Sequence, residues 1–154
     1  SKTFNIPGLG LSALIAEQPE QRTHLAEAFE LLHAGNHNPF SIVAFEAGYR
    51  HGDAWLDALM AYLAETRDTV TTFINERLPG LRVIPAQGTY LLWLDCRALG
   101  LDDAALKALF VDAGAGLSPG AVFGSGGSGF MRLNIGAPRT LIIAALSGLA
   151  QRLG

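Results

Sequence analysis

One long helical pattern in the middle of the chain constrains the fold more than any other feature. Apolar residues recur at helical spacing over residues 53–78, a length about twice that of an average helix. Asp53 is a suitable N-cap, and Pro79-Gly80 ends the pattern. A helix of this length is typical of a connector between two lobes, so we place the domain boundary inside it, between residues 65 and 66.

Shorter elements are expected before the long helix. The spacing predicts a buried strand or first helical turn over 11–15, a helix from residue 19 closed by Gly35, and a helix over 41–49 stopped at His51-Gly52. Residues 36–39 read as a break between the two helices.

The second half of the chain alternates between strands and helices. We expect strands over 82–85, 89–95, 116–119 and 130–135, and helices over 102–114 and 138–153. Asp102 is the expected N-cap of the first of these helices. This order is typical of a small α+β lobe, so the fold class we expect is α/β with an α+β lobe over residues 66–154.

Composition excludes several classes of protein. The 154 residues are 49% apolar and 16% charged, with a net charge of −3 and no cluster of Lys or Arg, which argues against nucleic-acid binding. We expect no membrane span and no signal peptide, and the single Cys96 fits a reducing cytoplasm. The low charge fraction indicates a surface covered by another domain or subunit, although an Ala- and Leu-rich composition has the same effect.

Lys2 is the first candidate for chemistry. It is one of two lysines, and it stands in a turn-like run of Thr, Phe, Asn, Pro and Gly. A lysine amine can form a Schiff base with an aldehyde cofactor, above all pyridoxal phosphate (PLP). The plainer alternative is a solvated surface lysine near a chain terminus.

Arg132 is the second candidate. The strand pattern places Met131 and Leu133 on one face and Phe130, Arg132 and Asn134 on the other. A charge in an otherwise apolar strand has to be paired or to lie at a cleft, and a guanidinium matches a carboxylate with two parallel hydrogen bonds. An exposed edge strand is an equally good interpretation.

Other motifs carry less chemistry. The glycine-rich loop 124–129 leads into a strand, whereas a phosphate-binding fingerprint follows a strand and opens a helix. We therefore expect a loop that borders the site or, more simply, an inert hairpin connection. The histidines and Cys96 do not have metal-ligand spacing, so no metal is expected; the histidines are His24, His33, His37 and His51.

Several segments share their order and spacing with one enzyme family. They are SKTFNIPGL at 1–9, NPFS at 38–41, GTYLLWLD at 88–95, LSPG at 117–120 with Phe123-Gly124, and FMRLNI at 130–135. Together they resemble the C-terminal part of fold-type I PLP enzymes. Within these, the resemblance is greatest to the cystathionine β-lyase (C–S lyase) branch of the class I/II aminotransferase family.

The resemblance implies an aspartate-aminotransferase-like fold. Residues 1–65 would end the PLP-binding large domain and include the connector helix, and residues 66–154 would form the small domain. Lys2, preceded by the small Ser1, would hold the cofactor and take the substrate's Cα proton. Arg132 would bind the α-carboxylate of the amino-acid substrate.

Further roles follow from the same resemblance. Tyr90 would lie on the substrate side, whereas we expect Trp93 to pack in the core. Asn38 and Pro39 match a loop that approaches the neighbouring subunit's site, which implies a homodimer. Gly10 stands where many aminotransferases have a phosphate-binding arginine, eight positions after the lysine, and this weakens an ordinary aminotransferase assignment.

The implied activity is β-elimination from cystathionine or cysteine conjugates to pyruvate, ammonia and a thiol. An aminotransferase is the enzymatic alternative, and an aminotransferase-like domain that senses an effector or binds a partner is the other. In the family, the aspartate at the ring nitrogen and most phosphate donors precede the lysine. The chain alone is therefore expected to hold PLP poorly and to be inactive.

Overall fold

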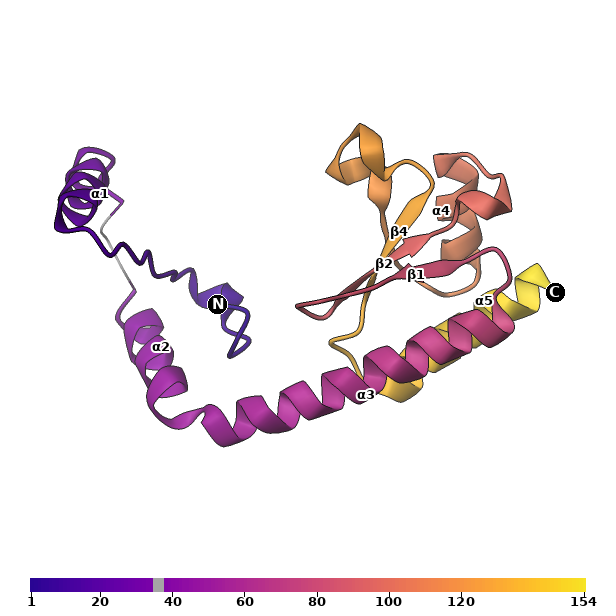
Figure 1. Cartoon of the computed structure of the whole chain (residues 1–154), viewed down its shortest axis with the longest axis horizontal. Coiled ribbons are helices and arrows are strands. Elements are labelled where there is room, and N and C mark those ends of the chain that lie inside the picture. The colour runs from indigo at the N-terminus through magenta and orange to yellow at the C-terminus, as the bar shows by residue number, and fades with distance from the viewer. Residues whose placement is uncertain (35–37) are drawn as a thin grey trace. The chain divides into compact units, whose positions relative to one another are not determined.

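The computed structural model describes residues 1–34 and 38–154. The chain divides into two compact units, Ser1–Leu59 and Met60–Gly154, and the longest helix runs from one into the other (Figure 1). This helix, α3 (Asp53–Arg77), has nearly the expected bounds, with Asp53 inside its first turn instead of at the N-cap. The enzyme domain boundary expected between residues 65 and 66 stays a prediction.

The first unit contains two short helices and the start of α3. These are α1 (Pro19–Leu31) and α2 (Pro39–His51), which follow a 3₁₀ turn at Pro7–Leu9. The expectation of a buried strand or helical turn over 11–15 is wrong. Those residues have no regular secondary structure, and Ile15 is 93% exposed because the unit offers this short run no packing partner. The C-cap expected at Gly35 and the first part of the break expected over 36–39, residues 36–37 with His37, lie outside the described residues. The break is shorter than expected at its other end, because Pro39 is the first residue of α2.

The second unit is built on a four-stranded antiparallel sheet. Its strand order is β1-β2-β4-β3, and every neighbouring pair is antiparallel. The strands are β1 (Arg82–Ile84), β2 (Leu91–Asp95), β3 (Ser118–Pro119) and β4 (Phe130–Asn134). All four lie where the sequence predicts strands, although β3 is shorter than expected.

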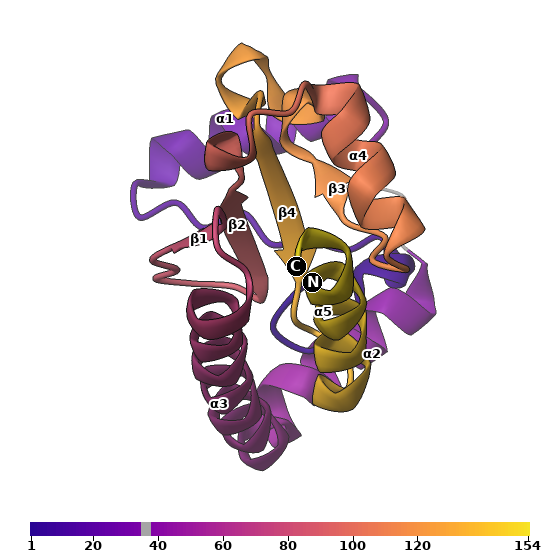
Figure 2. The ribbon, with the colours of Figure 1, turned by 90° about the vertical axis from the view of Figure 1, so that its right-hand side faces the viewer.

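Helices cover one face of this sheet. Two of them, α4 (Asp103–Asp112) and α5 (Arg139–Leu153), join the second half of α3, and α3 and α5 run side by side (Figure 2). Asp102 caps α4 as predicted, since its Oδ1 accepts from the Ala105 N–H at 2.8 Å. The core between sheet and helices is apolar; its fully buried members include Val70, Ile74, Leu92, Leu94, Leu106, Phe110, Met131 and Leu146.

Strand alternation separates this core from a second, more polar face. On β4, Met131 and Leu133 are buried whereas Arg132 is only half-buried, as the sequence pattern predicts. On β2, Trp93 pairs directly with Arg132 and shares its face. The expectation that Trp93 packs in the core is therefore wrong, because Leu92 and Leu94 take the core side of that strand. In the part of the chain that the structure describes, no helix is long and apolar enough to span a bilayer.

Candidate functional site

Lys2 lies in a hydrogen-bonded turn of the first unit. The Ile6 N–H donates to the Ser1 carbonyl at 2.9 Å and the Asn5 N–H to the Lys2 carbonyl at 3.3 Å. Asn5 has a φ of +53°, which asparagine tolerates better than most residues. The Lys2 side chain is exposed and forms no ion pair with any residue of the described ranges. The turn therefore presents an unpaired primary amine.

Phe4 anchors this turn to the end of α2. Its ring meets Tyr49 edge-to-face at 5.0 Å between centroids and lies 6.4 Å from Trp55. Gly48 makes room for the ring, since a Cβ at that position would lie 2.8 Å from the Phe4 ring. The buried Ser41 hydroxyl adds a second anchor by donating to the Leu9 carbonyl.

Asn38 and Pro39 have a local structural role at the start of α2. The Asn38 side chain caps the helix by accepting from the Phe40 N–H at 3.0 Å, and Pro39 occupies the first helical position. Their expected approach to a neighbouring subunit stays a prediction.

Arg132 in the second unit is held by uncharged groups. Its Nη2 lies 3.3 Å from the Ser118 hydroxyl on β3, and its guanidinium carbon lies 4.5 Å from the centroid of the Phe123 ring. Within residues 1–34 and 38–154, no carboxylate lies within ion-pair distance of Arg132, whereas Arg97 and Arg139 each have one. The Arg132 guanidinium therefore retains its capacity to bind a carboxylate.

Three aromatic rings, which we call the aromatic cluster, lie around Arg132: Trp93, Phe123 and Phe130. Trp93 stacks on Phe130 at 5.8 Å with an interplanar angle of 19°, and meets Phe123 edge-to-face at 5.8 Å. Arg97 lies over the far ring, 4.9 Å from the Phe130 centroid. These contacts between the rings fix the positions of the aromatic side chains next to Arg132.

Asp95 balances the charge at the other end of the same face. It is 9% exposed and accepts hydrogen bonds from Arg97 Nε at 2.9 Å, Arg97 Nη2 at 2.8 Å and Arg82 Nη2 at 3.1 Å. The hydrogen bonds from Arg97 hold the pKa of the Asp95 carboxyl well below its usual range, with a smaller contribution from Arg82. Arg97 and Arg82 are thus structural partners and, unlike Arg132, already paired.

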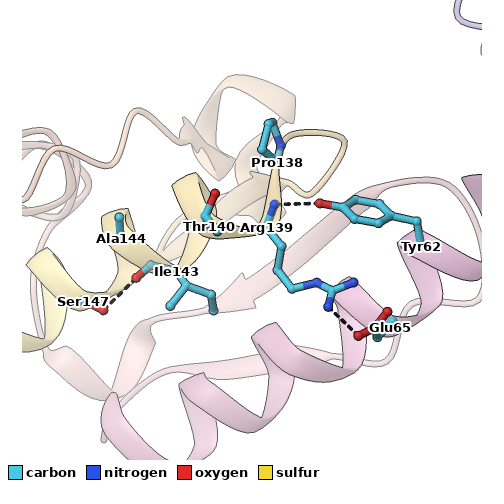
Figure 3. Close-up of a pocket in the computed structure, with 8 residues that line it drawn as sticks. All are labelled: Tyr62, Glu65, Pro138, Arg139, Thr140, Ile143, Ala144 and Ser147. Carbon is cyan, nitrogen blue, oxygen red and sulfur yellow. Dashed lines mark hydrogen bonds and ion pairs between the residues drawn. The ribbon is translucent and has the colours of Figure 1, made fainter.

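A pocket of the second unit lies between α3 and α5 (Figure 3). Arg139 crosses it: its backbone N–H donates to the Tyr62 hydroxyl at 2.7 Å, its Nε lies 3.2 Å from the Thr66 hydroxyl, and its Nη1 pairs with Glu65 at 2.5 Å. Because its donors are used between the two helices, Arg139 ties α5 to α3. We assign this pocket no chemistry.

The residues expected at the site are divided between the two units, with Lys2 in the first and both Tyr90 and Arg132 in the second. Tyr90 lies just before β2 with its ring against Gly136, and among the described residues it makes no hydrogen bond or ring contact with Arg132. Its expected place on the substrate side stays a prediction. Two contacts of Arg132, Ser118 and Phe123, belong to segments that resemble the family, but the sequence assigned neither of them a role at the site. Pairing strand 116–119 with strand 130–135 could have found Ser118, because the two strands place it opposite Arg132.

Comparisons with known proteins agree on one family. The family model "Aminotransferase class I and II" matches residues 1–147. Cystathionine beta-lyase PatB of Bacillus subtilis (strain 168) is 39% identical over 137 residues, which is 88% of this chain and 35% of PatB. Protein MalY of Escherichia coli (strain K12) is 36% identical over 151 residues, which is 97% of this chain and 39% of MalY.

A solved structure gives the same result. Cystalysin from Treponema denticola, whose crystal structure contains a pyridoxal 5'-phosphate cofactor, matches with a TM-score of 0.91 at 30% identity, over 98% of this chain and 39% of cystalysin. The chain spans less than half the length of each of these relatives. On this evidence the chain belongs to the class I and II aminotransferase family.

Proposed function

We propose that this chain is the C-terminal part of a PLP-dependent C–S β-lyase. The proposed reaction takes cystathionine or another cysteine thioether and one water to pyruvate, ammonia and a thiol. The observation that carries the proposal is Arg132, a guanidinium held by a ring and a hydroxyl with no carboxylate partner in the described ranges. The names of PatB and cystalysin's bound cofactor support it.

The residues present fit the cofactor. When bound, PLP supplies an aldehyde that bonds to an amine and a ring that withdraws electrons from the substrate's Cα. Lys2 offers an exposed amine without an ion-pair partner among the described residues, on a turn that Phe4 anchors. Ser1, the small residue before it, is also exposed. Lys2 and Ser1 are therefore the residues of this chain that we propose hold the cofactor.

Arg132 and Lys2 have separate roles in the proposed reaction, substrate binding and proton transfer. Arg132 binds the substrate α-carboxylate with two parallel N–H donors, which fixes the orientation of the Cα–H bond. Once the substrate amine has replaced it on the cofactor, the Nζ of Lys2 would be free to take the Cα proton as a general base. As the electron pair of that bond moves toward Cβ, the C–S bond breaks and the sulfur leaves as a thiolate.

We also propose that the full-length enzyme is a homodimer, with Asn38 and Pro39 near the neighbouring subunit's site. Exposed apolar side chains on α2 support this, because Phe40 is 77% exposed and Val43 is 66% exposed. Apolar groups gathered on one helix are characteristic of a surface that a partner covers.

The test uses the full-length protein that includes this chain, supplied with L-cystathionine. Pyruvate is measured with a coupled dehydrogenase and free thiol with a chromogenic disulfide. We expect both products in equal amounts, no turnover by Lys2→Ala, and a KM at least about tenfold higher in Arg132→Gln, because charge-assisted hydrogen bonds to the carboxylate are lost.

An aminotransferase is the alternative, since the family model has that name and LL-diaminopimelate aminotransferase of Natranaerobius thermophilus is 26% identical over 153 residues. It would yield a 2-oxo acid that retains the sulfur, without free thiol. Full turnover by Lys2→Ala would contradict both enzymatic assignments.

A further inference from the structure

We propose that Phe123 is a positioning residue that holds Arg132 ready for the substrate carboxylate and thereby sets the carboxylate affinity of the site. This inference rests on the proposed function, which assigns carboxylate binding to Arg132. Phe123 acts through Arg132 and does not itself touch the reacting atoms.

The first step of the argument is how Arg132 is held. A long arginine side chain has many rotamers, and fixing it on binding costs affinity. The Phe123 ring, 4.5 Å from the guanidinium carbon, attracts the cation through its π face and uses none of its N–H donors. The Ser118 contact, at 3.3 Å, is a long hydrogen bond. Most donors of Arg132 thus stay available.

Arg97 shows what a different arrangement looks like on the same face. Arg97 also lies over a ring, that of Phe130, but its Nε and Nη2 are bound to Asp95. Arg132 has the ring but no carboxylate partner among the described residues. A site that binds the carboxylate of a ligand requires an arginine whose N–H donors are not already bound to a carboxylate of the protein.

The second step is that Phe123 is itself fixed. Phe123 is 53% exposed, so burial in the core does not explain the position of its ring. Trp93 supports the ring edge-to-face, and Trp93 is in turn stacked on Phe130. The ring is therefore placed by the aromatic cluster, on the face that contains Arg132.

The third step is the backbone that presents Phe123. It ends a short 3₁₀ helix, Gly120–Phe123, and the next residue, Gly124, has φ +127° and ψ 172°, a conformation essentially restricted to glycine. Gly120 and Gly127 touch, since a Cβ on either would overlap the carbonyl oxygen of the other. This close backbone contact leaves the Phe123 Cα little freedom to move.

The test uses the full-length protein and distinguishes the effect of the π face of Phe123 from the effect of its apolar volume. Phe123→Leu keeps an apolar side chain but removes the π face, Phe123→Tyr keeps the face, and Val122→Ala is a control at an exposed neighbour. Two probes without an amine are compared: 3-(methylthio)propionate and its uncharged amide. Their Kd values are measured by ligand-observed NMR, together with KM and kcat for L-cystathionine.

We expect Phe123→Leu to raise Kd for the carboxylate about three- to tenfold, and to leave Kd for the amide within about twofold. KM should rise in parallel while kcat stays within about twofold. Phe123→Tyr and Val122→Ala should match the wild type. The proposal is overturned by an unchanged carboxylate Kd in Phe123→Leu, or by equal losses for carboxylate and amide, which would mean general packing.

Arg132→Gln distinguishes the failure of this inference from that of the proposed function. If Arg132→Gln weakens carboxylate binding and Phe123→Leu does not, only the positioning role of Phe123 fails. If Arg132→Gln leaves carboxylate binding unchanged, the assignment of Arg132 fails and the proposed function loses its main support.

Discussion

Some arginine residues of the second unit are neutralised by a carboxylate of the protein and have a structural role. Arg132 differs from them, and this difference makes it a candidate for ligand binding. Arg82 and Arg97 share Asp95, and Arg139 pairs with Glu65 across two helices. Arg132 faces a ring and a hydroxyl instead. A half-buried charge with no counter-ion among the described residues costs free energy, so the presence of Arg132 on this face is best explained by a ligand that supplies the negative charge.

Asp95→Asn should destabilise the second unit in a pH-dependent way. In the wild type, the folded-state pKa of Asp95 lies below its unfolded value, so its ionised form stabilises the fold at neutral pH. This stabilisation is present above the unfolded pKa of about 4 and is lost as pH falls through the lower folded pKa. We expect Asp95→Asn to lose about 1–3 kcal/mol of unfolding free energy at pH 7, and the difference from wild type to shrink below about pH 4.

Urea unfolding followed by circular dichroism from pH 2.5 to pH 7 measures this effect. Asp68→Asn is the matched control, because its pair with Arg67 is largely exposed and such pairs contribute little. A stability difference that stays constant over this pH range would contradict the role given to the Asp95 carboxylate.

The thiol of Cys96 should be unreactive in the native protein. Cys96 is 1% exposed, and burial, with a smaller contribution from the charge of Asp95, raises its pKa to about 12. Since the thiolate is the reactive form, we expect a chromogenic disulfide to leave it unmodified at pH 8 and to modify it fully in denaturant. Rapid native modification would contradict the burial of this residue.

Single-residue roles were predictable from sequence where a short pattern determines them. Alternation over 130–135 correctly placed Arg132 on one face of the strand and Met131 and Leu133 on the other face. The same rule applied to 91–95 would have placed Trp93 beside Arg132, but its apolar bulk favoured a core position. Phe123 stands in a segment that resembles the family, but its contact with Arg132 was not predictable, because it depends on how a glycine-rich turn folds.

Among the elements, the turn from Gly120 to Gly127 depends most on its glycines. Gly120→Ala would push a methyl group into the Gly127 carbonyl oxygen, and both partners are backbone atoms that cannot rotate away. We expect a loss of about 1–3 kcal/mol, which lowers Tm by several degrees. Gly126→Ala, where nothing lies within 4 Å, is the control in thermal unfolding and should stay close to wild type. Equal Tm values for the two variants would contradict the tight backbone contact.

Periodic elements were predictable and irregular ones were not. The patterns for α3, α4 and α5 gave bounds close to those observed, because each helix buries one apolar stripe. The 3₁₀ helices at Gly120–Phe123 and Ser125–Gly127 have no such period. Their geometry follows from backbone contacts between glycines, which composition alone does not reveal. The prediction for 11–15 was wrong because this apolar run has the composition of a buried element but no packing partner in its unit.

For the whole molecule, exposed large apolar side chains are concentrated in the first unit. In the first unit α1 has no buried residue and α2 buries only Ser41, although both contain large apolar side chains. The chain spans 35% of PatB and 39% of MalY. Coverage of this surface by another domain or subunit fits the low charge fraction better than composition bias does, because the exposed groups include Phe29, Phe40 and Trp55.

The isolated 154-residue chain should therefore bind PLP only weakly. Lys2 offers one covalent contact, but that bond is reversible, and tight binding needs further groups that hold the phosphate and the ring. Titration of the chain with PLP, followed by visible absorbance and by equilibrium dialysis, should show little more binding than Lys2→Ala shows. The full-length protein should bind stoichiometrically under the same conditions. Tight, Lys2-dependent binding by the isolated chain would show that these 154 residues already contain the phosphate-binding groups, and it would contradict a site completed by the rest of the enzyme.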